Sequence, residues 1–413
     1  MTVLDHAQKR VDAVIEEVDR LKQSDFPYDH SRDALELLGE ELVRLRNILK
    51  KVDPAGSSES ILPHCITSLD ALFNCVPLLG FILRSTNTRN AFEAYAPLLR
   101  LARKILGNAT KLIISSEWDY SPYVYTHDGY LANFIMLGLP APESANPLLL
   151  PLSGHELGHS TWKYNHISDR YEKRIERRIL QEITDKRLTF HSVFYSEFPK
   201  EDFSNNMFVW QIRATIYAWA VSQCEEIFCD FFGLRLFAES YLYAFEYLLS
   251  PGFPGERSVS YPNMKCRVSY LKEAAKAMNI EVKHKFTDSF IDTDKPDDKK
   301  KELMVSTADA VSKSLVPELI ILARKIVDEK AIPRMDSQII SDISKEFEMV
   351  IPTSKNHSIV NILNAGWRCY LNPELWNDIS QIKQEDKDRV LKDIMLKSME
   401  VSEAYERLGV QPQ

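Results

Sequence analysis

The chain lacks several features that would place it in a specialised class. Its six cysteines form no Cys-x-x-Cys pair, the spacing typical of redox and zinc-finger sites. No uninterrupted apolar run reaches membrane-spanning length, because prolines and polar residues at 140–147 break up the best candidate. The first ten residues are polar and lack the apolar core of a signal peptide. We find no internal repeat or low-complexity tract. These absences favour a globular protein with reduced, mostly buried thiols, and the cytoplasm as its compartment.

Composition and charge narrow the class further. The length of 413 residues suits two or three domains, or one large core with helical additions. The chain is 45% hydrophobic and 27% charged, which is ordinary for a globular protein. Its formal net charge of −8 argues against a nucleic-acid partner or an anionic membrane surface. We therefore expect neither partner.

The most informative segment is Leu148–Ser160, which contains His-Glu-Leu-Gly-His. His155 and His159 are four residues apart, so on a helix both imidazoles lie on one face and can bind one ion. Glu156 follows the first histidine and can take a proton from a water molecule held there. An apolar run leads into the motif, as expected of a buried helix, and Gly158 leaves space between the histidines. Roughly one chain in a hundred with this histidine content would carry the pattern by chance. The segment predicts a Zn²⁺ site that needs a third ligand.

A second helix supplies candidates for that third ligand. Glu226 and Asp230 are again four residues apart, in a segment that is apolar almost all round and therefore expected to be buried. Buried carboxylates are costly unless they are paired or bind a metal. Glu226 could complete a His₂Glu zinc site, and Asp230 could accept the free ring N–H of His155. The alternative is an exposed acidic patch.

Other residues compete for the third position. Glu225 is the rival ligand, but its partner one turn later is Cys229 rather than a carboxylate. His166 lies seven residues after the second histidine, without the glycine-containing spacer of families that use a third histidine. Cys224 and Cys229 flank Glu226 and can in principle bind a metal, although buried apolar thiols are the more ordinary interpretation.

His-Glu-x-x-His on one helix and Glu-x-x-x-Asp on a later one resemble the gluzincin group of zinc metallopeptidases. The likeness extends over residues 110–270 at most. The resemblance implies a zincin-like core, two histidines and a glutamate as zinc ligands, a glutamate as general base, and an aspartate that orients a histidine. In this chain the corresponding residues are His155, His159 and Glu226, then Glu156, then Asp230.

Two further expectations come from the same resemblance. Gluzincins hold extended substrate against an edge strand just before the zinc helix, and residues 133–139 are the corresponding stretch here. A Tyr-Pro turn followed by an arginine resembles the His-Pro-x-x-x-x-Arg turn of some membrane-linked gluzincins, with tyrosine in place of histidine. Tyr261 is therefore our candidate for stabilising the oxyanion that forms when water attacks a carbonyl.

The remaining chain predicts mostly helices. Heptad-type stripes over 11–21 and 35–49 predict an antiparallel helical hairpin, with a short coiled-coil seam as the alternative. A small sheet is expected from a strand at 111–115 and a hairpin over 123–136 that turns at Asp128–Gly129. Further helices are expected at 61–83, 88–106, 169–190, 208–221, 224–249, 302–330, 336–349, 356–371 and 384–408. Residues 361–371 are apolar enough to pack back onto the core.

Together these observations predict a mainly α protein with a small β-sheet. We expect an N-terminal helical region at 1–108, a zincin-like catalytic core at 109–290 and a C-terminal helical region at 291–413. The predicted function is a zinc metallohydrolase, namely a peptidase that acts on a peptide or protein substrate. The alternatives are a zinc amidase for a small non-peptide substrate, and a helical interaction or regulatory protein with a vestigial zinc site. The oligomeric state is left open.

Overall fold

A computed structural model describes residues 2–87, 91–118, 123–125, 131–143, 145–194, 207–252, 257–282, 286–292, 296 and 298–409. These residues are mainly helical, with one small sheet, as the sequence predicts. The chain divides into two compact units. The first contains residues 1–103 and 107–145, and the second contains residues 104–106 and 146–413.

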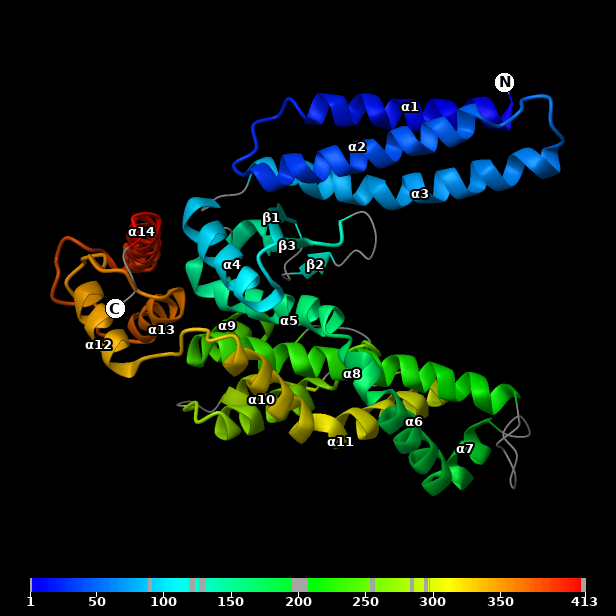
Figure 1. Ribbon diagram of the computed structural model, residues 1–413. Helices are drawn as coiled ribbons and strands as arrows, with labels where there is room; N and C mark the ends of the chain where they lie inside the picture. The colour runs from blue at the N-terminus through cyan, green and yellow to red at the C-terminus, as the bar shows by residue number, and fades with distance from the viewer. Residues whose placement is uncertain are drawn as a thin grey trace. The chain divides into compact units, whose positions relative to one another are not determined.

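The first unit begins with three long helices that pack on one another: α1 (Val3–Leu21), α2 (Asp29–Lys50) and α3 (Ser58–Arg84) (Figure 1). The heptad leucines of α2 are buried, so the two sequence stripes form the core of an antiparallel hairpin as predicted. Thr2 and Asp5 form a capping box that starts α1. After the short 3₁₀ turn Ser85–Asn87, α4 (Ala91–Leu106) ends at Gly107, whose φ of 109° suits a residue without a Cβ.

The sheet of this unit has three strands in the order β1-β3-β2, with bounds Lys111–Glu117, Phe134–Pro140 and Tyr123–Tyr125. β1 runs parallel to β3 and β2 antiparallel to it. Because β3 is paired on both sides, the expectation that residues 133–139 form an edge strand for substrate is wrong.

The predicted hairpin turn at Asp128–Gly129 lies outside the described residues. The register of the flanking strands nevertheless bears on it. Tyr125 pairs with Met136, whereas a two-residue turn at 128–129 would pair it with Ala132. The register that the sequence predicts for these strands is therefore wrong. β3 is followed by a 3₁₀ turn at Ala141–Glu143.

α3 carries a second apolar stripe that is not part of the hairpin core. Its exposed large apolar residues are Leu62, Ile66, Phe73, Val76 and Leu83. Among the described residues, α3 is also the helix that meets the length and composition criteria for a membrane span, with 39% of its most apolar window buried. Core helices meet the same criteria, so composition alone defines no span. The sequence places its best apolar candidate before residue 148 instead.

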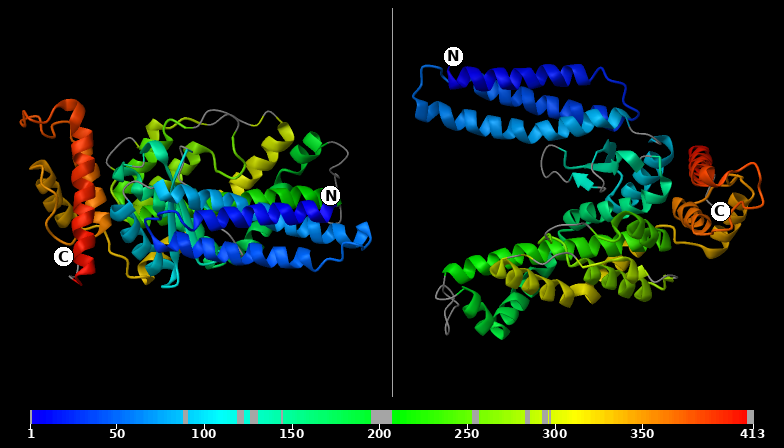
Figure 2. Two further views of the ribbon diagram at one scale, coloured as in Figure 1. Left: turned by 90° about the horizontal axis from the view of Figure 1, so that it is seen from above. Right: turned by 180° about the vertical axis from the view of Figure 1, so that it is seen from behind.

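The second unit is built around α8 (Met207–Phe237), which runs alongside α11 (Lys299–Glu329) (Figures 1 and 2). α5 (Ser153–Tyr164) crosses α8, and the 3₁₀ helix Pro147–Leu152 leads into it with all six residues buried. The sequence analysis placed two helices at 208–221 and 224–249. The structure has one long helix instead, which stops at Ala238 before α9 (Glu239–Leu249) begins.

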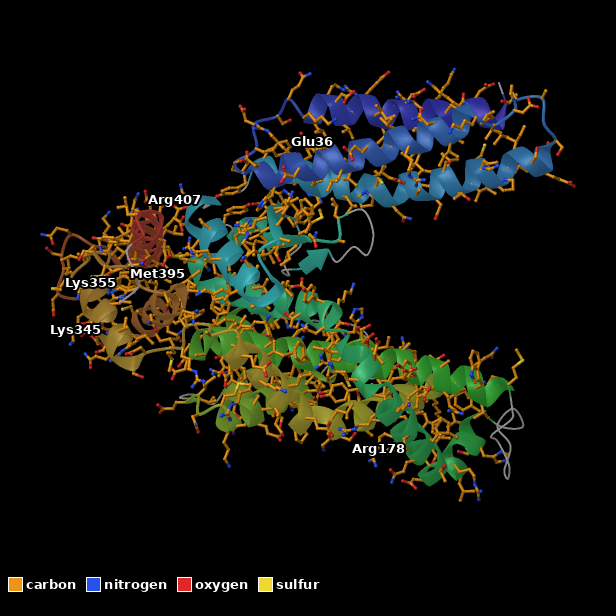
Figure 3. All side chains as sticks on the ribbon, in the orientation of Figure 1. Glu36, Arg178, Lys345, Lys355, Met395 and Arg407 are labelled. Carbon is orange, nitrogen blue, oxygen red and sulfur yellow. The ribbon has the colours of Figure 1, made fainter. Side chains whose placement is uncertain are left out.

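The other elements of this unit surround these helices. Two helices follow α5, and the remainder continue to the C-terminus: α6 (Ile167–Asp185), α7 (Arg187–Phe194), α10 (Met264–Ala277), a 3₁₀ turn (Phe286–Ser289), α12 (Ser337–Glu348), α13 (Ile359–Tyr370), a 3₁₀ turn (Gln384–Asp386) and α14 (Lys387–Arg407). Met395 of α14 fits against Gly366 of α13, where a Cβ would collide with it (Figure 3).

α13 packs back onto the core of the second unit, as the sequence predicts, where it contacts the 3₁₀ helix Pro147–Leu152, α8 and α9. The indole N–H of Trp367 donates a 2.9 Å hydrogen bond to the Leu148 carbonyl. Asn364 donates to the Phe237 carbonyl and accepts from the Ser240 N–H, so it spans the break between α8 and α9. The structure therefore groups residues differently from the predicted regions: the sheet belongs with the N-terminal helices, and 291–413 belong with the motif helices.

The α8–α9 break gives a stability prediction. Ala238 has φ 54° and ψ −134°, a conformation that costs a residue with a Cβ about 1–3 kcal/mol. Glycine adopts it without that cost, so Ala238→Gly should stabilise the protein by about 1 kcal/mol after its greater unfolded-state entropy is counted. We expect the melting temperature of the second unit to rise by about 2–4 °C.

Ala218→Gly is the matched control, because Ala218 is exposed in the regular part of α8. There the same substitution should destabilise by about 1 kcal/mol. An Ala238→Gly protein that melts at or below the wild-type temperature would contradict the strain argument.

Candidate metal centre

Glycines set the distance between the two helices of the candidate site. A Cβ at Gly154 would lie 2.9 Å from the Gly233 Cα, and one at Gly158 would lie 2.8 Å from the Cys229 Cα. Real Cβ atoms do not approach so closely, so α5 and α8 are in backbone contact along one turn of each helix. Gly158 therefore makes room for the opposite helix, and not for the two histidines as the sequence analysis proposed.

This contact brings His155 and His159 of α5 against the acidic turn of α8. The Nε2 atom of His155 lies 3.2 Å from one Glu226 carboxylate oxygen, and that of His159 lies 3.7 Å from the other. The two imidazole rings meet edge to face with centroids 4.9 Å apart. The distal nitrogens of both histidines thus face one carboxylate.

The proximal nitrogens have separate partners. Nδ1 of His155 lies 2.9 Å from Asp230 Oδ1, as the sequence predicted. Nδ1 of His159 lies 2.8 Å from Glu225 Oε1, a contact that the sequence analysis did not foresee because it considered Glu225 as a rival ligand. Each histidine is therefore held at Nδ1 by a carboxylate of α8, which leaves Nε2 available.

Asp230 is the most heavily bonded group of the site. The Arg267 guanidinium on α10 donates to both of its oxygens at 2.5 and 2.8 Å, and the Tyr241 hydroxyl on α9 donates at 2.8 Å. Burial would raise the pKa of Asp230, but the Arg267 charge and the hydrogen bonds outweigh it and hold the pKa well below its usual range. Asp230 is therefore an anion that fixes the orientation of His155.

Arg267 and Tyr241 are the residues that sequence reasoning missed. No local spacing in the sequence links either residue to Asp230, and only three-dimensional packing brings them to it. A partial signal existed for Arg267, since it is the arginine of the Tyr-Pro-x-x-x-x-Arg segment. Arg267 also lies 3.9 Å from Glu226 and supplies the buried positive charge beside both acids.

Burial changes the protonation of the acid and base groups. It raises the pKa of Glu156 to about 7 despite the opposing effect of both histidines, so this carboxyl can both take and give a proton near neutral pH. Burial lowers the pKa of His155, but its hydrogen bond to Asp230 and the nearby Glu226 carboxylate raise it to about 10. Burial would also raise the pKa of Glu226, but its contact with His155 lowers it.

Tyr261 lies at the edge of this cluster. Its ring stands over the Arg267 guanidinium at 5.1 Å, and the side chain is 40% exposed. Burial and then the Glu226 charge raise its pKa, so the hydroxyl stays a hydrogen-bond donor. Gln223 donates to the Val259 carbonyl and Arg257 to the Tyr261 carbonyl. These hydrogen bonds anchor the segment 257–263 that precedes α10. The oxyanion role predicted for Tyr261 remains a prediction.

The Cys229 thiol is a further possible metal donor beside the two histidines. A ring nitrogen of His155, one of His159 and the Cys229 sulfur lie within 4.8 Å of one another, so this group can hold a metal ion. Burial, followed by four surrounding carboxylates, raises the pKa of the Cys229 thiol well above its usual value. His166 is outside the group: its side chain is 82% exposed, and the residue directly precedes α6.

Comparison with known proteins adds nothing to this description, since no family model, curated protein or solved structure matches the chain.

The close helix contact yields a prediction that needs no assumption about function. Gly158→Ala adds a Cβ that must displace α8, and overpacking of this kind costs about 1–3 kcal/mol. The protein should melt at a lower temperature, even though alanine favours helix. Gly80→Ala in α3 is the control, because its Cβ would meet only the flexible end of Arg84. An increase in melting temperature for both variants would show that α5 and α8 are not in backbone contact.

Proposed function

We propose that this chain is a zinc-dependent metallohydrolase of the peptidase class, whose ligands are His155, His159 and Glu226. One observation carries the proposal: both Nε2 atoms face the two oxygens of Glu226, at 3.2 and 3.7 Å, while both Nδ1 atoms contact other carboxylates. Two imidazoles and a carboxylate, with the opposite ring nitrogens held, are the donors of a catalytic zinc site.

An unsatisfied atom supports the presence of a cation. Glu226 Oε2 is buried and has no hydrogen bond of acceptable geometry among the described residues, although Nε2 of His155 lies close to it. Unpaired buried carboxylate oxygens are costly. The cluster also contains the four acids Glu156, Glu225, Glu226 and Asp230, against Arg267 and His155, whose pKa of about 10 makes it a second cation. A divalent cation beside Glu226 would offset both deficits.

Glu226 suits the third position better than Cys229 does. Its two oxygens span the gap between the distal nitrogens of both histidines. The Cys229 backbone and side chain instead pack against Gly158 at the helix crossing. A thiol surrounded by carboxylates also resists ionisation, and the thiolate is the form that binds zinc.

The motif glutamate supports hydrolysis in particular. When bound, zinc supplies a Lewis acid that activates water and polarises a carbonyl. Glu156 is buried beside the histidines with its pKa near neutrality, so it can accept a proton from the attacking water and pass it to the leaving amine. Asp230, fixed by Arg267 and Tyr241, holds His155. Tyr261 would donate a hydrogen bond to the developing oxyanion.

The arrangement on α5 and α8 fits the gluzincin resemblance, and we propose a zincin-like core in the second unit on that basis. We also propose a cytoplasmic protein with a peptide or protein substrate. A zinc amidase with a small substrate would use the same residues. The vestigial-site alternative is disfavoured by the buried Glu156, because a purely structural zinc site needs no general base.

Glu156→Gln tests the catalytic role. Glutamine keeps the size of the side chain but cannot take a proton, so kcat on a peptide library should fall by about 10²–10⁴-fold. Zinc content should stay at the wild-type value, because Glu156 is not a ligand. Glu176→Gln, on the exposed face of α6, is the matched control and should leave both readouts unchanged.

Turnover that survives in Glu156→Gln at the wild-type rate would contradict a role for Glu156 as the base. Zinc binding without peptide turnover in the wild type, but with cleavage of small amides, would favour the amidase. Zinc binding without turnover of either substrate would leave the vestigial site.

A further inference from the structure

We propose that Glu225 is a positioning residue that holds His159 through Nδ1, so that adjacent glutamates of α8 divide the work: Glu226 binds the metal and Glu225 orients one of its ligands. The inference rests on the proposed zinc site. It concerns a residue whose role the sequence left open between rival ligand and exposed acid.

The geometry distinguishes the two glutamates. Glu225 Oε1 lies 2.8 Å from Nδ1 of His159, and Glu226 Oε1 lies 3.7 Å from Nε2 of the same ring. These nitrogens are on different edges of the imidazole, so the two carboxylates approach it from different sides. A glutamate that accepts the Nδ1 proton fixes the tautomer with a lone pair on Nε2, which is the form that binds a metal.

The same arrangement exists at the other histidine. Asp230 Oδ1 lies 2.9 Å from Nδ1 of His155, and Nε2 of His155 faces Glu226. Glu225 and Asp230 therefore play equivalent parts on either side of Glu226. Carboxylate partners of this kind raise the basicity of the ligand and lock the ring orientation.

Glu225 can be tested more cleanly than Asp230. The Asp230 side chain is 1% exposed and also bonds Arg267 and Tyr241, so its substitution would disturb the core. The Glu225 side chain is 21% exposed and contacts His159, which is 17% exposed. Loss of Glu225 should therefore leave the fold intact and let His159 rotate.

The experiment compares four full-length proteins with the wild type: Glu225→Ala, Glu225→Gln, Glu226→Ala and the control Glu176→Gln. Zinc affinity is measured by competition with a chromophoric chelator. The visible absorption spectrum of each Co²⁺-loaded protein reports which atoms bind the metal, and circular dichroism reports folding. None of these readouts depends on activity.

We expect Glu225→Ala to bind zinc about 10–100-fold more weakly than the wild type, with an unchanged cobalt spectrum. Glu225→Gln should recover most of the affinity, because its amide oxygen can accept the same hydrogen bond. Glu226→Ala should lose more affinity and change the cobalt spectrum. Glu176→Gln should match the wild type.

One result would overturn the inference alone: wild-type affinity in a folded Glu225→Ala protein would show that His159 needs no partner. A changed cobalt spectrum in Glu225→Ala, with an unchanged one in Glu226→Ala, would make Glu225 the ligand and would refute both this inference and the assignment of Glu226. A wild-type protein that binds neither metal would instead refute the proposed zinc site, and the role of Glu225 with it.

Discussion

The backbone contact between α5 and α8 is the constraint on which the rest of the candidate site depends. Gly154 and Gly158 on one helix meet Gly233 and Cys229 on the other, at distances that exclude a Cβ on α5. Side chains next to this backbone contact project into the narrow space between α5 and α8, so those of one helix contact those of the other. His155 and His159 therefore reach the acidic turn of α8 without long or mobile side chains. The packing that stabilises the helix pair is the same packing that assembles the donors.

Charge imposes the second constraint. Four carboxylates share a largely buried volume with Arg267 and His155, and burial opposes the ionised form of Glu156, Glu226 and Asp230. Arg267 is committed mainly to Asp230, which also receives Tyr241, so Asp230 is satisfied. Glu226 is not, since one of its oxygens has no hydrogen bond among the described residues. The uncompensated negative charge therefore lies at Glu226, where the Nε2 atoms of both histidines converge. A cation bound there would neutralise it.

The sequence could predict what local spacing determines. The i, i+4 pairs place His155 with His159 and Glu226 with Asp230, and the structure brings these pairs together as expected. The heptad leucines of α2 and the apolar segment around Trp367 likewise point to contacts that the structure contains. Each of these inferences needed only helical periodicity and burial.

What the sequence could not supply depends on contacts between distant segments. Arg267 and Tyr241 reach Asp230 because α9 and α10 turn back on α8, and no local pattern encodes that return. Consecutive acids such as Glu225 and Glu226 differ only in the direction they face, which the neighbouring helix decides. The pairing of β3 on both edges and the break at Ala238 also follow from tertiary structure.

The most direct test of the account is the metal content of the purified protein, wild type beside Glu226→Ala, by inductively coupled plasma mass spectrometry after zinc is supplied and excess removed. The account predicts about one zinc per wild-type chain and its loss, or a large reduction, in the variant. Zinc retained at the wild-type level in Glu226→Ala, or no metal in either protein, would contradict the central claim that His155, His159 and Glu226 form a zinc site.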